Sequence, residues 1–119
     1  MASKLEIWLL KAKALAYILY HALRGDIKRV RSGDVAPWSR LRYWLERLEG
    51  NGIRVYTCPL PVEVAGFSYP PLPLIIVSPD CITIPVVLHE YGHIRAGFMS
   101  GEDEAEFVKE KCLWRGDLV

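Results

Sequence analysis

Cysteine is scarce in this sequence, and the few cysteines form no recognisable pattern. The 119-residue chain contains three, Cys58, Cys81 and Cys112, with no C-x-x-C pair among them. An odd number of scattered cysteines disfavours both a disulfide framework and a cysteine-rich zinc site. Reduced thiols are typical of proteins in a reducing compartment, so we expect a cytoplasmic protein in which these side chains act as small apolar residues.

Net charge is also nearly absent, at +1. A chain with so little excess positive charge is not expected to bind nucleic acid directly. Its most basic stretch, Lys28–Arg31, is interpreted as a solvated helix end or loop. The apolar N-terminal segment is interrupted by Lys11 and Lys13, so its unbroken apolar run is too short to span a bilayer. We therefore expect an amphipathic helix there and no membrane partner.

Two helices are predicted in the first 50 residues. Apolar residues recur at helical spacing from about Leu5 to Leu23, and Gly25 ends that helix. A second helix is predicted to start near Pro37 and to run to the Gly-Asn-Gly stretch at 50–52. Its apolar face includes Trp38, which we expect to be buried.

The middle of the chain predicts a small sheet. The runs IRVYTCPL and LPLIIVSP are rich in β-branched and apolar residues, and the segment between them offers a third short strand. We expect two or three strands, antiparallel and with an exposed edge, packed on the N-terminal helices. Two more helices are predicted after them. This order predicts one α+β domain over 1–119, with a helical part at 1–50 and the remaining elements at 52–119.

Two of the three histidines flank a glutamate in the stretch HEYGH. Residues from Ile84 to about Ala96 are predicted to be helical, with Thr83 as N-cap. At about 100° per residue, His89 and His93 lie one turn apart on the same face, so both can bind one ion. Two imidazoles and a carboxylate, with one position left open, are typical of catalytic zinc. The sequence therefore predicts one Zn²⁺ per chain.

Glu90 follows the first histidine and is displaced around the helix from it. It is therefore expected to stay outside the coordination sphere and to act as general base on a metal-activated water in peptide-bond hydrolysis. The group that stabilises the oxyanion stays open among Tyr56, Tyr69 and Arg95. Cys81, just before the helix, is a further candidate to lie near the metal.

A cluster of acidic residues follows this helix after a short turn, in the stretch SGEDEAE. Ser100 is predicted to cap a final helix there, Asp103 to close a capping box, and the acids to suit the first turn. The segment Glu102–Glu106 also reads E-x-x-A-E. H-E-x-x-H followed by a helix bearing E-x-x-A-D/N is the signature of gluzincin metallopeptidases. From residue 52 onward, the order of elements resembles that of the ImmA/IrrE-type zinc metallopeptidases.

The resemblance implies a minimal zincin fold and assigns roles to the acidic cluster. By that match, Glu102 would be the third zinc ligand, Ala105 would face the active-site helix, and Glu106 would orient a ligand histidine. Geometry leaves a choice between the two glutamates. Glu102 is better placed if the active-site helix ends at Gly97, whereas Glu106 is the alternative ligand if that helix runs on to Met99.

The function expected from these patterns is that of a zinc metallopeptidase acting on an extended peptide or protein segment. The resemblance implies a repressor or regulator protein as substrate. Two alternatives stay open. The domain could be a zinc-stabilised interaction module that hydrolyses nothing. It could also be a latent protease whose C-terminal tail, with Trp114 and Asp117, lies in the cleft.

Overall fold

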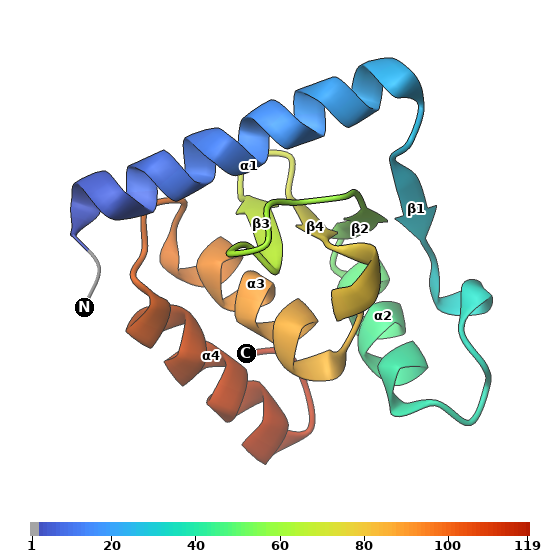
Figure 1. The fold of residues 1–119 in the computed structure, drawn as a ribbon. Helices are drawn as coiled ribbons and strands as arrows, with labels where there is room; N and C mark the ends of the chain where they lie inside the picture. The colour runs from blue at the N-terminus through green and yellow to red at the C-terminus, as the bar shows by residue number, and fades with distance from the viewer. Residues whose placement is uncertain (1–2) are drawn as a thin grey trace.

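The computed structural model describes residues 3–119 as an α+β fold of four α-helices and a four-stranded mixed sheet (Figure 1). The elements are α1 (Lys4–Arg24), β1 (Lys28–Val30), α2 (Arg40–Gly50), β2 (Arg54–Thr57), β3 (Gly66–Tyr69), β4 (Leu74–Val77), α3 (Ile84–Ala96) and α4 (Glu102–Arg115). The predicted α+β class is confirmed. Within residues 3–119, no helix combines the length and the apolar character that crossing a bilayer requires.

The sheet differs from the prediction in strand number and in direction. Its order is β1-β2-β4-β3, with β2 and β4 parallel and the two outer pairs antiparallel. The expected two or three antiparallel strands were wrong because β1 comes from the basic stretch Lys28–Val30, which was interpreted as a helix end or loop. Three residues with two cations carry no alternation signal, and their pairing with β2 depends on contacts distant in sequence.

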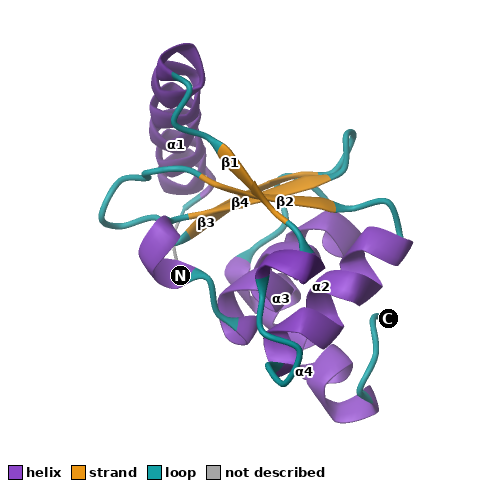
Figure 2. Ribbon diagram, turned by 90° about the vertical axis from the view of Figure 1, so that its right-hand side faces the viewer, coloured by secondary structure: helices purple, strands orange, loops and turns teal. Residues whose placement is uncertain are grey.

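Helices cover both faces of the sheet (Figure 2). Helix α1 lies on one face, and α2, α3 and α4 lie on the other. The central strand β4 is buried on both sides: Ile75 and Val77 belong to the core beneath the three helices, and Ile76 belongs to the core beneath α1. A strand covered on both faces carries a continuous apolar run, which explains the sequence LIIV.

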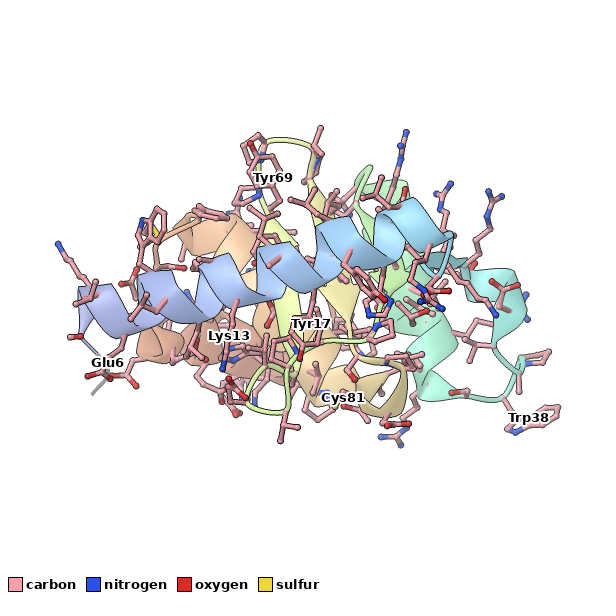
Figure 3. All side chains as sticks on the ribbon, turned by 45° about the horizontal axis from the view of Figure 1, so that its top comes forward. Glu6, Lys13, Tyr17, Trp38, Tyr69 and Cys81 are labelled. Carbon is pink, nitrogen blue, oxygen red and sulfur yellow. The ribbon has the colours of Figure 1, made fainter. Side chains whose placement is uncertain are left out.

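Trp38 is exposed, so its predicted burial was wrong. Helix α2 begins at Arg40, because the Ser39 side chain accepts a hydrogen bond from the backbone N–H of Leu41 and caps the helix there. Trp38 thus precedes the helix instead of lying on its apolar face. It is 86% exposed and points away from the edge of the molecule (Figure 3).

The C-terminal segment packs against the core beneath α2 and α3. Gly116 adopts a φ of 74° at the end of α4 and turns the chain back. The Tyr91 hydroxyl then donates to the backbone carbonyl of Val119 at 2.7 Å, and Leu118 joins the same core. Trp114 stays exposed. This placement does not fit the latent-protease alternative, in which the tail would lie in the cleft.

Candidate metal centre

Helix α3 has the bounds that the sequence predicts. The Thr83 side chain accepts from the backbone N–H of Val86, and Pro85 occupies the first turn. The helix ends at Ala96, because Gly97 has a φ of 117°, a conformation that side-chain-bearing residues rarely adopt. Helix α4 starts only a few residues later. Helix α3 thus ends at Gly97, its C-cap, and with that end the sequence favours Glu102 over Glu106 as the third ligand.

Helices α3 and α4 meet closely at a glycine. A Cβ atom on Gly92 would lie 2.4 Å from the backbone oxygen of Ala105 and 2.7 Å from its Cα atom. Ala105 is fully buried against this point, so it faces α3, the helix that carries HEYGH. The two small residues let the helix backbones approach closely enough for side chains of one helix to reach those of the other.

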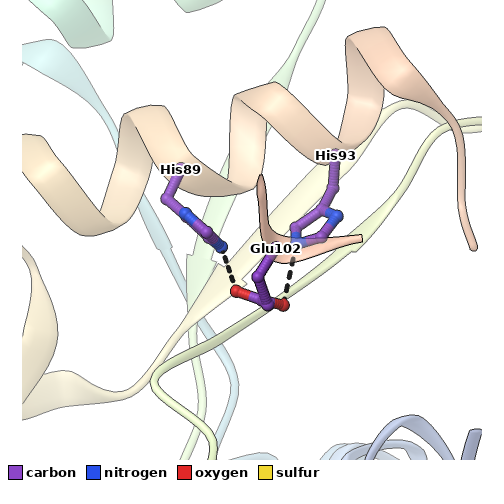
Figure 4. Close-up of side chains that lie close together, drawn as sticks. All are labelled: His89, His93 and Glu102. Atoms are coloured by element: carbon purple, nitrogen blue, oxygen red, sulfur yellow. Dashed lines mark hydrogen bonds and ion pairs between the residues drawn. The ribbon is translucent and has the colours of Figure 1, made fainter. Parts of the chain in front are cut away.

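His89, His93 and Glu102 converge at this helix pair (Figure 4). The Nε2 atom of His89 lies 2.5 Å from Oε2 of Glu102, and Nε2 of His93 lies 3.2 Å from Oε1 of the same carboxylate. One potential ligand atom from each of the three residues lies within 4.8 Å of the others. The structure therefore brings together the three residues that the sequence analysis singles out as ligands.

The outer nitrogen of each imidazole has its own partner. Nδ1 of His89 lies 2.6 Å from Oε1 of Glu106, and the other oxygen of Glu106 lies 2.8 Å from Lys109 Nζ. Glu106 thus lies where the resemblance expects a residue that orients a histidine. The Glu106 carboxylate accepts a hydrogen bond from Nδ1–H and leaves Nε2 directed at Glu102.

Ser100 is the corresponding partner of His93, and sequence reasoning missed it. Its Oγ atom lies 2.8 Å from Nδ1 of His93 and donates to the Gly97 carbonyl at 2.6 Å. Because the hydroxyl proton is used on Gly97, Oγ accepts the Nδ1–H of His93, and Nε2 is directed at Glu102. The predicted capping by Ser100 was wrong: Gly101 is the N-cap, and Glu104 accepts its backbone N–H.

Ser100→Ala is expected to weaken zinc binding by about 10–100-fold, as loss of an orienting partner usually does. His93 is buried, so its Nδ1–H would lose its only acceptor and the ring would lose its fixed orientation. Ser78→Ala is the matched control, because the Ser78 side chain caps nothing. Zinc titration against a competing chelator measures both variants. Equal affinity in Ser100→Ala and wild type would show that Ser100 does not orient His93.

The ionisation states of His89 and Glu102 are coupled through their contact. The hydrogen bond to Glu102, reinforced by that to Glu106, raises the pKa of His89 to about 9 despite its partial burial. The same contacts with His89 and His93 hold the pKa of Glu102 well below its usual range. At neutral pH His89 therefore carries a proton that it shares with the Glu102 carboxylate. A divalent cation can replace that proton, and this donor set fits zinc.

Glu90 is buried but unpaired. The residue is 7% exposed, and among residues 3–119 its side chain has no hydrogen-bond partner. Burial raises its pKa, an effect that the nearby His93 and His89 oppose. It lies against Gly66 of β3, where a Cβ atom would come within 2.7 Å of Glu90 Cγ. Gly66 therefore makes the space that lets this carboxyl lie beside the edge of the sheet.

A cavity of about 290 Å³ opens beside the three residues. Glu90, His93 and Glu102 line it from one side, while α1 and the start of β3 form the other walls; His89 does not line it. Lys11 of α1 also lines it, with Nζ 4.7 Å from the centre of the Phe98 ring. Sequence reasoning missed Lys11, because no local pattern predicts where α1 packs.

Other predicted candidates lie elsewhere. The proposed oxyanion donors Tyr56, Tyr69 and Arg95 do not line the cavity. Tyr69 packs edge-on against Phe98 at 5.7 Å. Cys81, only partly buried, is not part of the group that could hold a metal within residues 3–119.

Comparisons of the chain with models of protein families, with curated proteins and with solved structures found no match. The functional assignment of this site therefore depends on its geometry and on the sequence motifs.

Proposed function

We propose that this protein is a zinc-dependent metallopeptidase, a minimal zincin of the ImmA/IrrE type. One observation carries the proposal. Glu90, an unpaired and buried carboxyl group, opens into the same cavity as His93 and Glu102. A purely structural metal site has no use for such a group. The substrate we propose is an extended segment of a protein, such as a repressor or another regulator.

The residues present fit a catalytic zinc ion. His89, His93 and Glu102 would supply two nitrogens and one oxygen, which leaves a fourth position open. Glu106 and Ser100 hold the two rings so that both Nε2 atoms face the carboxylate. Bound zinc would supply a Lewis acid that lowers the pKa of water and polarises a carbonyl group.

Glu90 is proposed to be the general base. Its carboxylate would accept a proton from the attacking water and pass it to the leaving amine. The contact with Gly66 restricts its position, and the lack of another hydrogen-bond partner leaves its oxygens free for this proton. Lys11 is the cation in the opposite wall, placed to face negative charge that develops on the substrate carbonyl.

The edge of β3 offers backbone groups for an extended substrate. The Ser78 N–H bonds to the Ala65 carbonyl, and β3 pairs with β4 in antiparallel register. The alternation of antiparallel hydrogen bonds then directs the N–H and C=O groups of Gly66 and Ser68 to the outer edge. An added strand would pair there and pass beside Glu90.

Glu90→Gln tests this function directly. The change keeps size and polarity but removes the base, so we expect activity to fall by at least about 100-fold. Zinc content and thermal stability should stay close to those of the wild type, because Glu90 is not a ligand. Glu110→Gln, an exposed change on α4, is the control and should cleave normally. Mass spectrometry of a digested pool of unfolded proteins measures cleavage, and elemental analysis measures zinc.

Two results would contradict the proposal. A Glu90→Gln protein that cleaves at the wild-type rate would show that the base lies elsewhere. A zinc-loaded wild type that cleaves no protein in the pool, and whose partner binding is unchanged by Glu90→Gln, would favour a zinc-stabilised interaction module.

A further inference from the structure

The outer face of α1 carries an apolar stripe that nothing covers in the described chain. Its members recur at spacings of four and three residues and lie opposite the buried Ala14 and Ile18. They are Leu5, Leu9, Ala12, Ala16, Leu19 and Leu23. The four leucines are between 58% and 90% exposed. Figure 3 looks onto this side of the molecule, with α1 in front of all other elements.

This stripe, which we call the α1 seam, has the spacing of a coiled-coil interface. Alternation of four and three residues keeps a row of side chains on one side of a helix that pairs with another helix. At about 100° per residue, the six positions fall within a sector of about 80°. No charged residue lies within that sector; Lys13, Glu6 and Arg24 follow one border of it. Large exposed apolar patches of this kind mark interaction sites.

The order of residues along the seam is the same in both directions. It reads Leu, Leu, Ala, Ala, Leu, Leu, and it is symmetric about position 14. If a second α1 lies antiparallel to the first, Leu5 faces Leu23, Leu9 faces Leu19 and Ala12 faces Ala16. Leucines then pack on leucines at both ends, and the alanines let the helices approach closely in the middle. A surface that complements itself in this way suits a two-fold symmetric pair.

Charges on the border agree with the antiparallel direction. Glu6 and Arg24 are 18 residues apart, which is five helical turns, so they lie on the same border at opposite ends. In an antiparallel pair, Glu6 of one copy falls beside Arg24 of the second copy, and the symmetry repeats this contact. In a parallel pair, the two-fold axis would run along the helices, so this border of one copy would lie on the opposite side of the interface from the same border of the other, and Glu6 could not reach Arg24.

We propose that the protein forms a two-fold dimer in which α1 packs antiparallel against α1 of a second copy through the α1 seam. The inner face of α1 forms a wall of the cavity through Ile7, Leu10 and Lys11, and the seam lies on the outer side. Pairing therefore leaves the cavity open while it braces the helix. The dimer does not depend on the proposed peptidase function.

Sedimentation velocity over a range of concentrations tests the pairing. The wild type is expected to sediment as a dimer, and Ala16→Glu, which places charge at the centre of the seam on an exposed position, as a monomer with an unchanged helical spectrum. Phe107→Glu, which removes an exposed apolar residue from α4, is the control and should remain dimeric. A wild type that is monomeric throughout, or that is monomeric and binds phosphatidylcholine vesicles through this helix, overturns the proposal.

Cysteine cross-linking tests the direction and still reports if Ala16→Glu fails to fold. In a Cys81→Ser background, Leu5→Cys chains mixed with Leu23→Cys chains should form a mixed disulfide dimer. Neither variant alone should cross-link, because antiparallel packing places the two copies of position 5 about 27 Å apart at 1.5 Å per residue. Cross-linking of Leu5→Cys with itself, and not with Leu23→Cys, would overturn the antiparallel arrangement.

Discussion

Gly92→Ala is expected to abolish zinc binding and to destabilise the protein strongly. The added Cβ atom would lie 2.4 Å from the oxygen and 2.7 Å from the Cα atom of Ala105. These are backbone atoms, so no side chain can rotate away, and α3 and α4 must separate. Overpacking of this kind typically costs about 1–3 kcal/mol, occasionally more. His89 and His93 lie on one helix and Glu102 on the other, so the separation also divides the ligand set.

Chemical denaturation and zinc titration measure the two effects of Gly92→Ala. The matched control is Gly50→Ala at the end of α2, where a Cβ atom meets nothing within 4 Å. Because alanine restricts the unfolded chain more than glycine does, this control should be unchanged or more stable by up to about 1 kcal/mol. Full zinc affinity in Gly92→Ala would show that the close approach of α3 and α4 does not hold the site together.

Glu102→Gln is expected to lower zinc affinity by more than about 100-fold, beyond the range for loss of an orienting partner. Glu102 faces the Nε2 atoms of both histidines, so a neutral amide there removes the anionic ligand. Glu106→Gln should have a smaller effect, because Glu106 contacts only one of the two histidines, His89, and only through its outer nitrogen. Glu104→Gln is the control. Its side chain accepts only the backbone N–H of Gly101, a role that glutamine also fulfils.

Competition with a chelator at fixed pH measures the loss of zinc affinity, which should be largest for Glu102→Gln, smaller for Glu106→Gln and smallest for Glu104→Gln. The reverse result, in which Glu106→Gln loses zinc and Glu102→Gln keeps it, would make Glu106 the third ligand. Glu102 would then be only a hydrogen-bond partner of the metal-free histidines.

The parts of the site that the sequence predicts well are those with a local cause. The spacing of His89 and His93 places them on one helical face, and Thr83 and Gly97 mark where that helix starts and stops. Because Gly97 ends α3 early, before Met99, Glu102 lies next to the two rings, as the sequence predicts for the shorter helix. One turn of α4 then places Glu106 beside His89.

The parts that the sequence did not predict depend on contacts between distant segments. Lys11 reaches the cavity only because α1 packs across the sheet, which no pattern within α1 indicates. The parallel pairing of β2 with β4 also joins segments that are distant in sequence, so no local pattern predicts it. Ser100 carried a misleading local signal: a serine just before an acidic run is typical of a helix cap, but the nearby His93 uses its hydroxyl instead.

Anomalous diffraction at the zinc edge, from crystals grown with equimolar zinc, tests the central claim most directly. The structure predicts a single peak per chain, coordinated by Nε2 of His89, Nε2 of His93 and a carboxylate oxygen of Glu102, at about 2.0–2.2 Å. Glu106 and Ser100 should keep their contacts with the two Nδ1 atoms. A peak held by a different set of side chains, or no peak between α3 and α4, would contradict the assignment of this site as a zinc centre.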